Sequence, residues 1–412
     1  SVQGGVVNIT MPPEQSQPRL RPTPVLLRPR RFPGLLDRKT ETNTAVAALR
    51  YIQPVEYYGA PGWGKTSLLR HLAHHLPNTA FPDGVIFLAS RQQTLPDLLQ
   101  FLFDVFYESD STFKPTEVQL RQSLQNRQAI VLLDDVDLAR PEVQGLLDVA
   151  PECAFFLASP DRRLWGEGRA VELGGLPADD GVILFERELD RQLTKQERPL
   201  VVEIFSALRG HPLHLLQAAA LVREQRYTLA ELAQHVKKDP STEALAAEIV
   251  AGLSDPEQQV MKLLAALNGA PLSIDHLAEI AGLSEPEQIL QTLARRQLVQ
   301  AHSPRYSVTG TLGQTLAQMW ELSAKAEEAL NYFANWAEQN QQLPEQVLSE
   351  IDTILQLQTW AAEPGKWVDV LRLGRAIEVP LALAKRWGAW EQVLLRGLQA
   401  GELINDRVTV AY

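Results

Sequence analysis

An eight-residue stretch near the front of the chain carries the clearest chemical signal. It reads Gly59-Ala60-Pro61-Gly62-Trp63-Gly64-Lys65-Thr66, which matches the P-loop pattern G-x-x-x-x-G-K-T at every defined position. The glycines let backbone N–H groups approach phosphate oxygens, the lysine reaches the β- and γ-phosphates, and the threonine hydroxyl can ligate Mg²⁺. We therefore predict a site for ATP or ADP with Mg²⁺, formed by Gly59, Pro61, Gly62, Trp63, Gly64, Lys65, Thr66 and Ser67.

The flanks of this stretch have the composition that the motif requires. An apolar strand is expected over Val55–Tyr58, and an apolar-periodic helix begins at Ser67. The N-terminus of that helix adds favourable dipole charge beside a bound phosphate. A chance glycine-rich turn does not need this strand–loop–helix arrangement, so we favour phosphate binding.

A second set of reactive side chains ends an apolar run. Residues 129–133 predict a buried strand, and Asp134 and Asp135 follow it directly, in the form of a Walker B motif. The carboxyl ends of parallel strands meet at the edge where α/β proteins bind ligands. We expect Asp134 to hold Mg²⁺ together with Thr66, and Asp135 to orient or deprotonate the attacking water. Two solvated acids at a strand end are the alternative.

A third polar group follows another apolar run. Residues 154–158 predict a buried strand that is preceded by Cys153, whose thiol we expect to be an inert part of the core. This strand leads into Ser159-Pro160-Asp161-Arg162-Arg163. We assign Arg162 as a sensor of the γ-phosphate, and an ordinary polar loop is an equal alternative. Arg162 completes a catalytic set with Lys65, Asp134 and Asp135.

The composition narrows the class of protein. The 412 residues carry a formal net charge of −11, which argues against a general binder of nucleic acid or of anionic membranes. The single cysteine excludes an internal disulfide. We find no apolar run that suits a membrane span and no signal peptide, so we expect a cytoplasmic protein. Because the sequence begins with Ser1 rather than Met, we expect a fragment of a longer chain.

The sequence predicts five regions in order. Residues 1–31, rich in proline and arginine, predict a linker or extended arm. Alternating strands and helices predict an α/β P-loop NTPase domain over 32–175, with a parallel sheet and helices on both faces. An α-helical lid domain is expected over 176–250 and a winged-helix domain over 251–318. The α-helical region over 319–412 is expected to lead into tetratricopeptide-like sensor repeats.

With these motifs in this order, the chain resembles the STAND signal-transducing ATPases, in particular their NB-ARC branch, over roughly residues 32–318. Residues 32–41 look like the family's hydrophobic-Gly-Arg-x-x-Glu segment, and Gly210-His211-Pro212 looks like its Gly-x-Pro. The two nucleotide-binding motifs and the expected winged helix complete the resemblance. It implies that Leu36 and Arg38 bind the nucleotide and that Pro212 packs on the adenine.

Three positions depart from the family pattern. Asp37 stands where glycine is usual. The family often has Thr-Thr-Arg after the sensor strand, and Ala158-Ser159-Pro160 stands there in this chain, so Arg162 or Arg163 has to serve. Val308-Thr309-Gly310 replaces Met-His-Asp, whose histidine touches the β-phosphate of ADP and keeps the switch closed. Control by that charged side chain is therefore lost here.

The resemblance implies a regulated switch with slow ATP hydrolysis. ADP would hold a closed form, a ligand sensed by the C-terminal helices would allow exchange for ATP, and the ATP state would self-associate. The N-terminal arm would tether an effector domain outside this sequence, with an output such as defence or cell death in a bacterium. Two other functions stay open: an ATP-regulated winged-helix transcriptional regulator and a remodelling ATPase with fast turnover. Acidic residues outnumber basic ones over 254–310, so we do not expect DNA binding.

Overall fold

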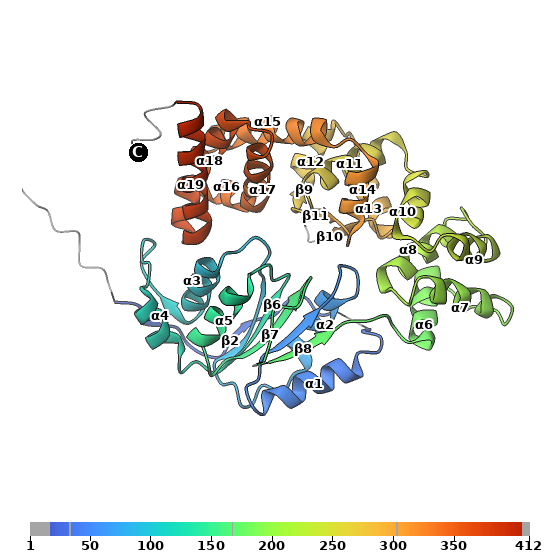
Figure 1. Cartoon of the computed structure of the whole chain (residues 1–412), viewed down its shortest axis with the longest axis horizontal. Coiled ribbons are helices and arrows are strands. Elements are labelled where there is room, and N and C mark those ends of the chain that lie inside the picture. Colours follow the sequence, from blue (N-terminus) through green and yellow to red (C-terminus); the bar gives the residue numbers. More distant parts are fainter. Residues whose placement is uncertain (1–16, 33, 167, 302–303, 406–412) are drawn as a thin grey trace, which may run out of the picture.

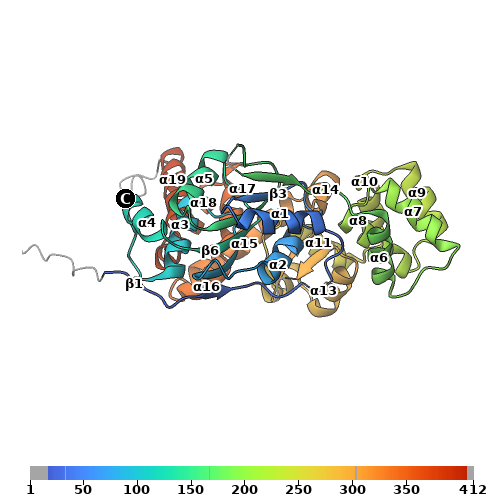
Figure 2. The same cartoon turned by 90° about the horizontal axis from the view of Figure 1, so that it is seen from below.

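The structure, a computed structural model, describes residues 17–32, 34–166, 168–301 and 304–405. The chain first forms an α/β half and then, from about residue 176, a mostly helical half. Figure 1 shows the helical half arching over one edge of the sheet, with the C-terminal helices above the α/β half. In both views the helices drawn in green lie together at one end of the molecule (Figures 1 and 2).

The α/β half is built on a six-stranded sheet with the order β2-β4-β6-β7-β3-β8. The strands are β2 (Val25–Leu27), β3 (Val55–Tyr58), β4 (Gly84–Ala89), β6 (Ala129–Asp134), β7 (Ala154–Ser159) and β8 (Arg169–Glu172). Every neighbouring pair is parallel. The central strands are continuous apolar runs because helices cover a parallel sheet on both faces.

Five helices cover this sheet: α1 (Lys39–Leu49), α2 (Lys65–His75), α3 (Leu95–Phe106), α4 (Glu117–Leu124) and α5 (Arg140–Val149). Helices α1 and α2 share an apolar core with one face, which includes Phe156. Helices α3, α4 and α5 share a second core with the other face, which includes Phe155. Consecutive residues of a strand point to opposite faces, so these two phenylalanines enter different cores. The predicted parallel sheet with helices on both faces is confirmed.

The N-terminal segment departs from the predicted linker. Residues 1–16 lie outside the described residues, but β1 (Arg19–Leu20) pairs with β5 (Tyr107–Glu108), and β2 adds an edge strand beside β4. Gly84 permits this pairing, because an added β-carbon would lie 2.0 Å from the Val25 carbonyl oxygen. Prolines flank β2 without interrupting it, which an edge strand tolerates. Within the predicted linker or extended arm, residues 19–20 and 25–27 therefore form paired strands of the α/β half.

The helical half has three groups of elements. The first is α6 (Ala178–Leu189), α7 (Glu197–Ala207), α8 (Pro212–Arg223), α9 (Leu229–Lys238) and α10 (Thr242–Val250). The second is α11 (Asp255–Ala266), α12 (Ile274–Ala281), α13 (Pro286–Arg295) and α14 (Leu312–Met319), with β9 (Leu272–Ser273), β10 (Val299–Ala301) and β11 (Arg305–Val308). The third is α15 (Ser323–Gln339), α16 (Pro344–Ser349), α17 (Ile351–Ala362), α18 (Trp367–Leu383) and α19 (Trp387–Leu403).

One apolar cluster runs through all three groups, from Val182 to Ala400. In the part of the chain that the structure describes, this cluster contains no residue of the α/β half. A partly buried ion pair reinforces it, since both Nη atoms of Arg305 donate to the carboxylate of buried Glu350 at 2.7 Å. The helical half is therefore one packed body. Among its described helices and those of the α/β half, none has both the length and the apolarity to cross a bilayer.

Among the described residues the two halves share no apolar core, and polar contacts join α3 to α19. The buried carboxylate of Asp97 caps α3 and also accepts the N–H groups of Gly388 and Ala389 at the start of α19, at 2.8 and 3.2 Å. The Trp387 indole N–H donates to Gln100 of α3 at 2.9 Å. One carboxylate thus caps two helices, one from each half, where helix dipoles favour negative charge.

We predict that Gly388→Ala separates α19 from α3. A β-carbon added at Gly388 would lie 1.8 Å from Thr94 Oγ1, whereas one added at Gly397 of the same helix would have only Leu371, at 3.9 Å. Gly388→Ala should lower the melting temperature by roughly 2–8 °C and speed hydrogen exchange in α3 and α19. The matched control Gly397→Ala should stabilise α19 by up to about 1 kcal/mol. Equal behaviour of the two variants would contradict this packing.

Candidate nucleotide-binding site

The predicted P-loop joins β3 to α2, as the motif requires. Gly62 and Gly64 have φ values of +92° and +88°, which residues with a β-carbon rarely adopt. Gly64 occupies the N-cap position of α2, and Lys65 and Thr66 are the first residues of that helix, ahead of Ser67. The first N–H groups of a helix have no partner within it, so they are available to an anion. The local sequence therefore forms an anion-binding turn.

Lys65 and Thr66 lie beside the acidic pair. The Lys65 ammonium donates to two carbonyl oxygens of the loop, and Thr66 Oγ1 donates to Asp134 Oδ1 at 3.1 Å. Burial lowers the pKa of Lys65, and the nearby carboxylates of Asp135 and Asp134 oppose that shift. The structure thus brings together four residues that the sequence predicts from two separate motifs.

Asp134 ends β6 and is 7% exposed. Burial raises its pKa to about 6, while the hydrogen bond from Thr66 acts in the opposite direction. Its backbone carbonyl accepts both the N–H and the hydroxyl of Ser90 at 2.7 Å, which fixes the strand end. A buried carboxylate beside a hydroxyl is an oxygen donor set that Mg²⁺ accepts, and a cation would offset the cost of burying the charge. These residues fit the predicted metal.

Asp135 has different surroundings from its neighbour. Its φ of +61° is left-handed, and its side chain is 57% exposed, with Oδ2 3.9 Å from Nε of Arg91. An exposed carboxylate directly after a metal-ligating one is placed to contact a water molecule at the same edge of the sheet. The arrangement therefore suits the predicted division of roles between the two acids.

The segment before α1 is tied to the P-loop by Arg38. Its buried guanidinium donates to the carbonyl oxygens of Trp63 at 3.0 Å and Gly174 at 2.9 Å. Asp37 and Arg38 have φ values of +54° and +66°. This explains why glycine is expected at position 37 and why aspartate, which tolerates the left-handed region, can replace it. Leu36, just before this turn, is partly buried.

The turn before α8 lies against the P-loop. A β-carbon added at Gly62 would lie 2.5 Å from the His211 ring and 3.1 Å from Leu213 Cβ. The ring centroids of His211 and Trp63 are 4.3 Å apart. Pro212 is the first residue of α8, as predicted, and lies between two residues that crowd Gly62.

His211 makes this contact as a neutral ring. Its Nδ1 accepts the N–H of His214 at 3.3 Å, which caps α8, and the ring also hydrogen-bonds to the backbone of Pro61. Burial, and then the neighbouring His214 ring, lower the pKa of His211 to about 3. A protonated ring would lose its Nδ1 acceptor, so the contact depends on the neutral form.

Residues 308–310 complete the contact from a third unit. A β-carbon added at Gly310 would lie 2.5 Å from Leu213 Cδ2. The adjacent Thr309 is buried, and its hydroxyl donates to the Gln297 carbonyl at 2.7 Å. The position where the family has a histidine is therefore beside the α8 turn, but its hydroxyl is engaged within its own unit.

Arg162 is placed differently from the other predicted catalytic residues. Its guanidinium lies over the Trp165 ring at 4.0 Å, and its Nε donates to the Leu164 carbonyl at 3.0 Å. Arg163 lies 3.7 Å from an Asp137 carboxylate oxygen. None of the contacts found among the described residues joins Arg162 to the P-loop, so its sensor role stays a prediction.

Comparisons with known proteins bear on the fold. A scan against protein-family models and a search of curated proteins find no match. Among solved structures, the chain is similar to a Signal Transduction ATPase with Numerous Domains (STAND) with a tetratricopeptide repeat sensor from Pyrococcus horikoshii. The TM-score is 0.55 and the identity 15%, over 92% of this chain and 66% of that one.

Three findings point to the same fold. They are the P-loop between β3 and α2, the acidic pair at the end of β6, and this structural similarity. The chain has a P-loop NTPase fold. A Walker-type ATPase of Pyrococcus abyssi is also similar, at 18% identity over 71% of this chain and 99% of that one, but with a TM-score of only 0.36. The similarity with the TM-score of 0.55 supports the fold, and at 15% identity it does not show the branch.

Three residues near the site of this P-loop NTPase were not predicted from the sequence, because no motif marks them. Buried Glu56 in β3 accepts the N–H groups of Arg163 and Leu164 at 2.8 Å each, and so shapes the loop after β7. The sequence signal that could have indicated this role is the position of Glu56, a charged residue within an apolar strand. Arg91 follows a buried strand at the carboxyl edge, and His211 fills the variable position of Gly-x-Pro, so neither stands out in the sequence.

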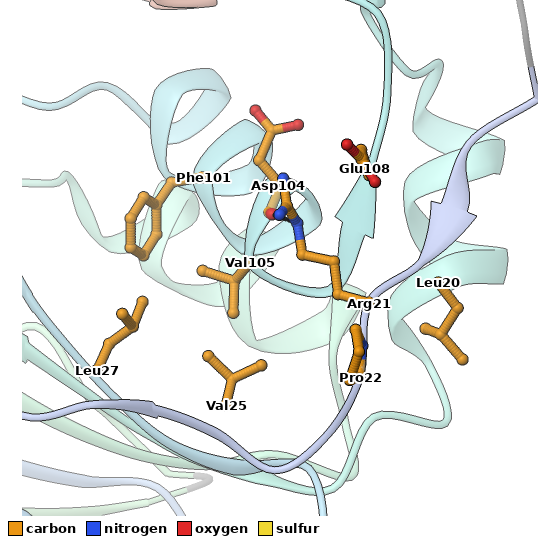
Figure 3. Close-up of a pocket in the computed structure, with 9 residues that line it drawn as sticks. All are labelled: Leu20, Arg21, Pro22, Val25, Leu27, Phe101, Asp104, Val105 and Glu108. Atoms are coloured by element: carbon orange, nitrogen blue, oxygen red, sulfur yellow. Dashed lines mark hydrogen bonds between the residues drawn. The ribbon is translucent and has the colours of Figure 1, made fainter.

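The NTPase fold also has a cavity of about 490 Å³ at the β2 edge of the sheet, between β2 and α3 (Figure 3). Val25 and Leu27 form one wall, and Phe101 and Val105 of α3 form the other. None of the predicted site residues lines this cavity. The nucleotide site is therefore assigned to the P-loop.

We predict that His211 stays neutral at pH values where ordinary histidines are protonated. Its folded-state pKa of about 3 lies below the usual 6.5, so the unfolded chain takes up the proton first. The contact with the P-loop is then stable above pH 6.5 and weakens as the pH falls toward 3. NMR of labelled histidines, with His211→Gln to assign the signal, should show a neutral ring at pH 5. An ordinary titration near 6.5 would mean that the ring does not pack on the loop.

Proposed function

We propose that this chain is a nucleotide-dependent switch of the STAND type that binds ATP or ADP with Mg²⁺ and hydrolyses ATP slowly. Within it, residues 176–250 act as a lid, 251–318 as a winged-helix domain and 319–412 as the start of a sensor. We propose the NB-ARC branch because of the order of the motifs described above.

The observation that carries this proposal is the crowding of three units around Gly62 and Leu213. The P-loop belongs to the NTPase core. The turn before α8 belongs to the proposed lid, and the residues beside Thr309 belong to the proposed winged helix. A nucleotide on the P-loop would lie next to Pro212 and Arg38, and so would contact more than one unit. A ligand shifts a conformational equilibrium only when it binds the two states differently, and a site shared between units has that property.

This chain has groups that could bind both the phosphates of the nucleotide and the metal ion. Lys65 and the first N–H groups of α2 would hold phosphate oxygens, and Thr66 with Asp134 would hold Mg²⁺. Bound Mg²⁺ would supply charge neutralisation. Asp135, exposed at the same edge, would orient the attacking water.

The interface between the halves supports a switch. Hydrogen bonds and ion pairs, such as those of Asp97, can be replaced by water at a small net cost, unlike a shared apolar core. We assign the closed arrangement to the ADP state and self-association to the ATP state. We further propose that an activating ligand acts through the C-terminal helices and that the output of the switch is defence in a bacterium.

Three of the four basic residues over 251–318, the proposed winged helix, favour a structural role over DNA reading. Arg296 pairs with Glu224 of the lid at 2.9 Å, and Arg305 pairs with Glu350 at 2.7 Å. Lys262 lies over the Trp320 ring at 5.4 Å. These cations already bind groups of this chain, so they are not free for phosphates of DNA.

We predict that Lys65→Ala weakens the binding of both ATP and ADP at least tenfold, which corresponds to about 1.4 kcal/mol. The loss follows from removing the cation that faces the phosphates. Isothermal titration calorimetry measures it, with Lys262→Ala as a control that removes a cation elsewhere. If the unmodified chain binds neither nucleotide, the proposal is wrong.

Asp135→Asn should leave ATP affinity within about twofold and slow single-turnover hydrolysis roughly 100-fold, since a positioned base contributes about that much. Quench-flow measurement of ADP formation tests this. An unchanged rate would remove Asp135 from the reaction. Steady-state turnover by the unmodified chain above about 1 s⁻¹ would favour a remodelling ATPase instead.

A further inference from the structure

Arg91 joins the proposed hydrolysis site to the helical half. It lies in the connection from β4 to α3, and its Nη1 and Nη2 donate to the carbonyl oxygens of Gly269 and Asn268 at 2.6 Å each. Its Nε lies 3.9 Å from Asp135 Oδ2. A single guanidinium therefore lies beside Asp135 of the α/β half and binds the turn after α11.

The turn after α11 has the shape that receives this guanidinium. Asn268 and Gly269 have φ values of +47° and +81°, and their carbonyl groups lie at the C-terminal end of α11, where the helix dipole favours a cation. A β-carbon added at Gly269 would lie 2.5 Å from Nη2 of Arg91 and 2.8 Å from Nη1. The glycine therefore leaves room for the arginine.

Neighbouring residues of the same connection extend this linkage. Ser90 binds the carbonyl of Asp134 at 2.7 Å, and Gln92 Nε2 donates to Gln356 of α17 at 2.7 Å. Asp97 accepts the first N–H groups of α19. Residues 90–97 thus run from the proposed metal ligand to several points on the helical half.

We propose that Arg91 is a positioning residue that restrains Asp135 while the helical half is docked. ATP that binds before the activating ligand opens the molecule is then hydrolysed slowly, and hydrolysis becomes faster when residues 268–269 move away. This inference rests on the proposed function, because it adds a regulator to the same hydrolysis site.

The restraint has an electrostatic basis. Asp135 is more than half exposed, and an ion pair to a freely moving arginine is worth little at such a position. Two hydrogen bonds to the turn after α11 hold the guanidinium in place, so its charge stays beside the carboxylate. Carboxylate oxygens that face a fixed cation are less available to orient a water molecule. When the turn moves away, Arg91 loses both anchors and Asp135 becomes available.

The test is single-turnover hydrolysis of ATP preloaded on the full chain, with ATP affinity measured separately by calorimetry. Arg91→Gln should raise the hydrolysis rate about threefold to tenfold at unchanged affinity, because the restraining charge is gone. Gly269→Ala should raise it similarly, since it displaces the guanidinium while keeping the arginine. The double variant should be no faster than Arg91→Gln, because both changes act through one contact. The control Arg121→Gln removes an exposed arginine of α4 and should keep the original rate.

The outcomes separate this inference from the proposed function. ATP binding with an unchanged or lower rate in Arg91→Gln overturns the inference alone. Additive effects of Arg91→Gln and Gly269→Ala also overturn it, because the two residues would then act independently. Failure of the unmodified chain to bind ATP overturns the proposed function and the inference together.

Discussion

The contact between Gly62 and the turn that contains His211 and Leu213 is the constraint on which the rest of the structure depends. It is possible only because position 62 has no β-carbon and a φ of +92°. The turn itself is held by Gly210, whose carbonyl accepts the N–H of Leu176 at 3.0 Å, and a β-carbon there would lie 2.7 Å from the Leu176 oxygen. Two glycines thus bring the phosphate-binding loop and the start of α8 together, and any ligand of the loop lies beside that junction.

Apolar packing stabilises each half of the molecule, but it contributes little between the halves. Each half has extensive apolar cores, but no apolar cluster of the described residues spans both halves. Apart from the packing of the P-loop on His211 and Leu213, the contacts described across the boundary are made by carbonyl, carboxylate and guanidinium groups, such as those of Asp97 and Arg91. Such an interface is specific in geometry and modest in net stability, so the halves can separate without either one unfolding. That combination is what a molecule with two packed arrangements requires.

Much of the α/β half could be predicted from the sequence, because each of its elements has a local signal. Continuous apolar runs predicted β6 and β7, and the P-loop and the acidic pair were placed by motif and strand order. The N-terminal strands were missed because Pro22 and Pro24 indicate irregular structure, and pairing with β4 depends on distant Gly84. The role of His211 could not be predicted, since packing on Trp63 is a tertiary contact. In the sequence, Arg91 belongs to no motif, and only the fold places it between Asp135 and the turn after α11.

The central claim is that one nucleotide is shared between the P-loop and the turn before α8. Hydrogen exchange of the full chain, followed during titration with ADP and Mg²⁺, tests this claim most directly. The account predicts that residues 59–66 and 209–215 become protected together, with the same midpoint in ADP concentration. Protection of the P-loop alone, with exchange in the second segment unchanged at saturation, would contradict it.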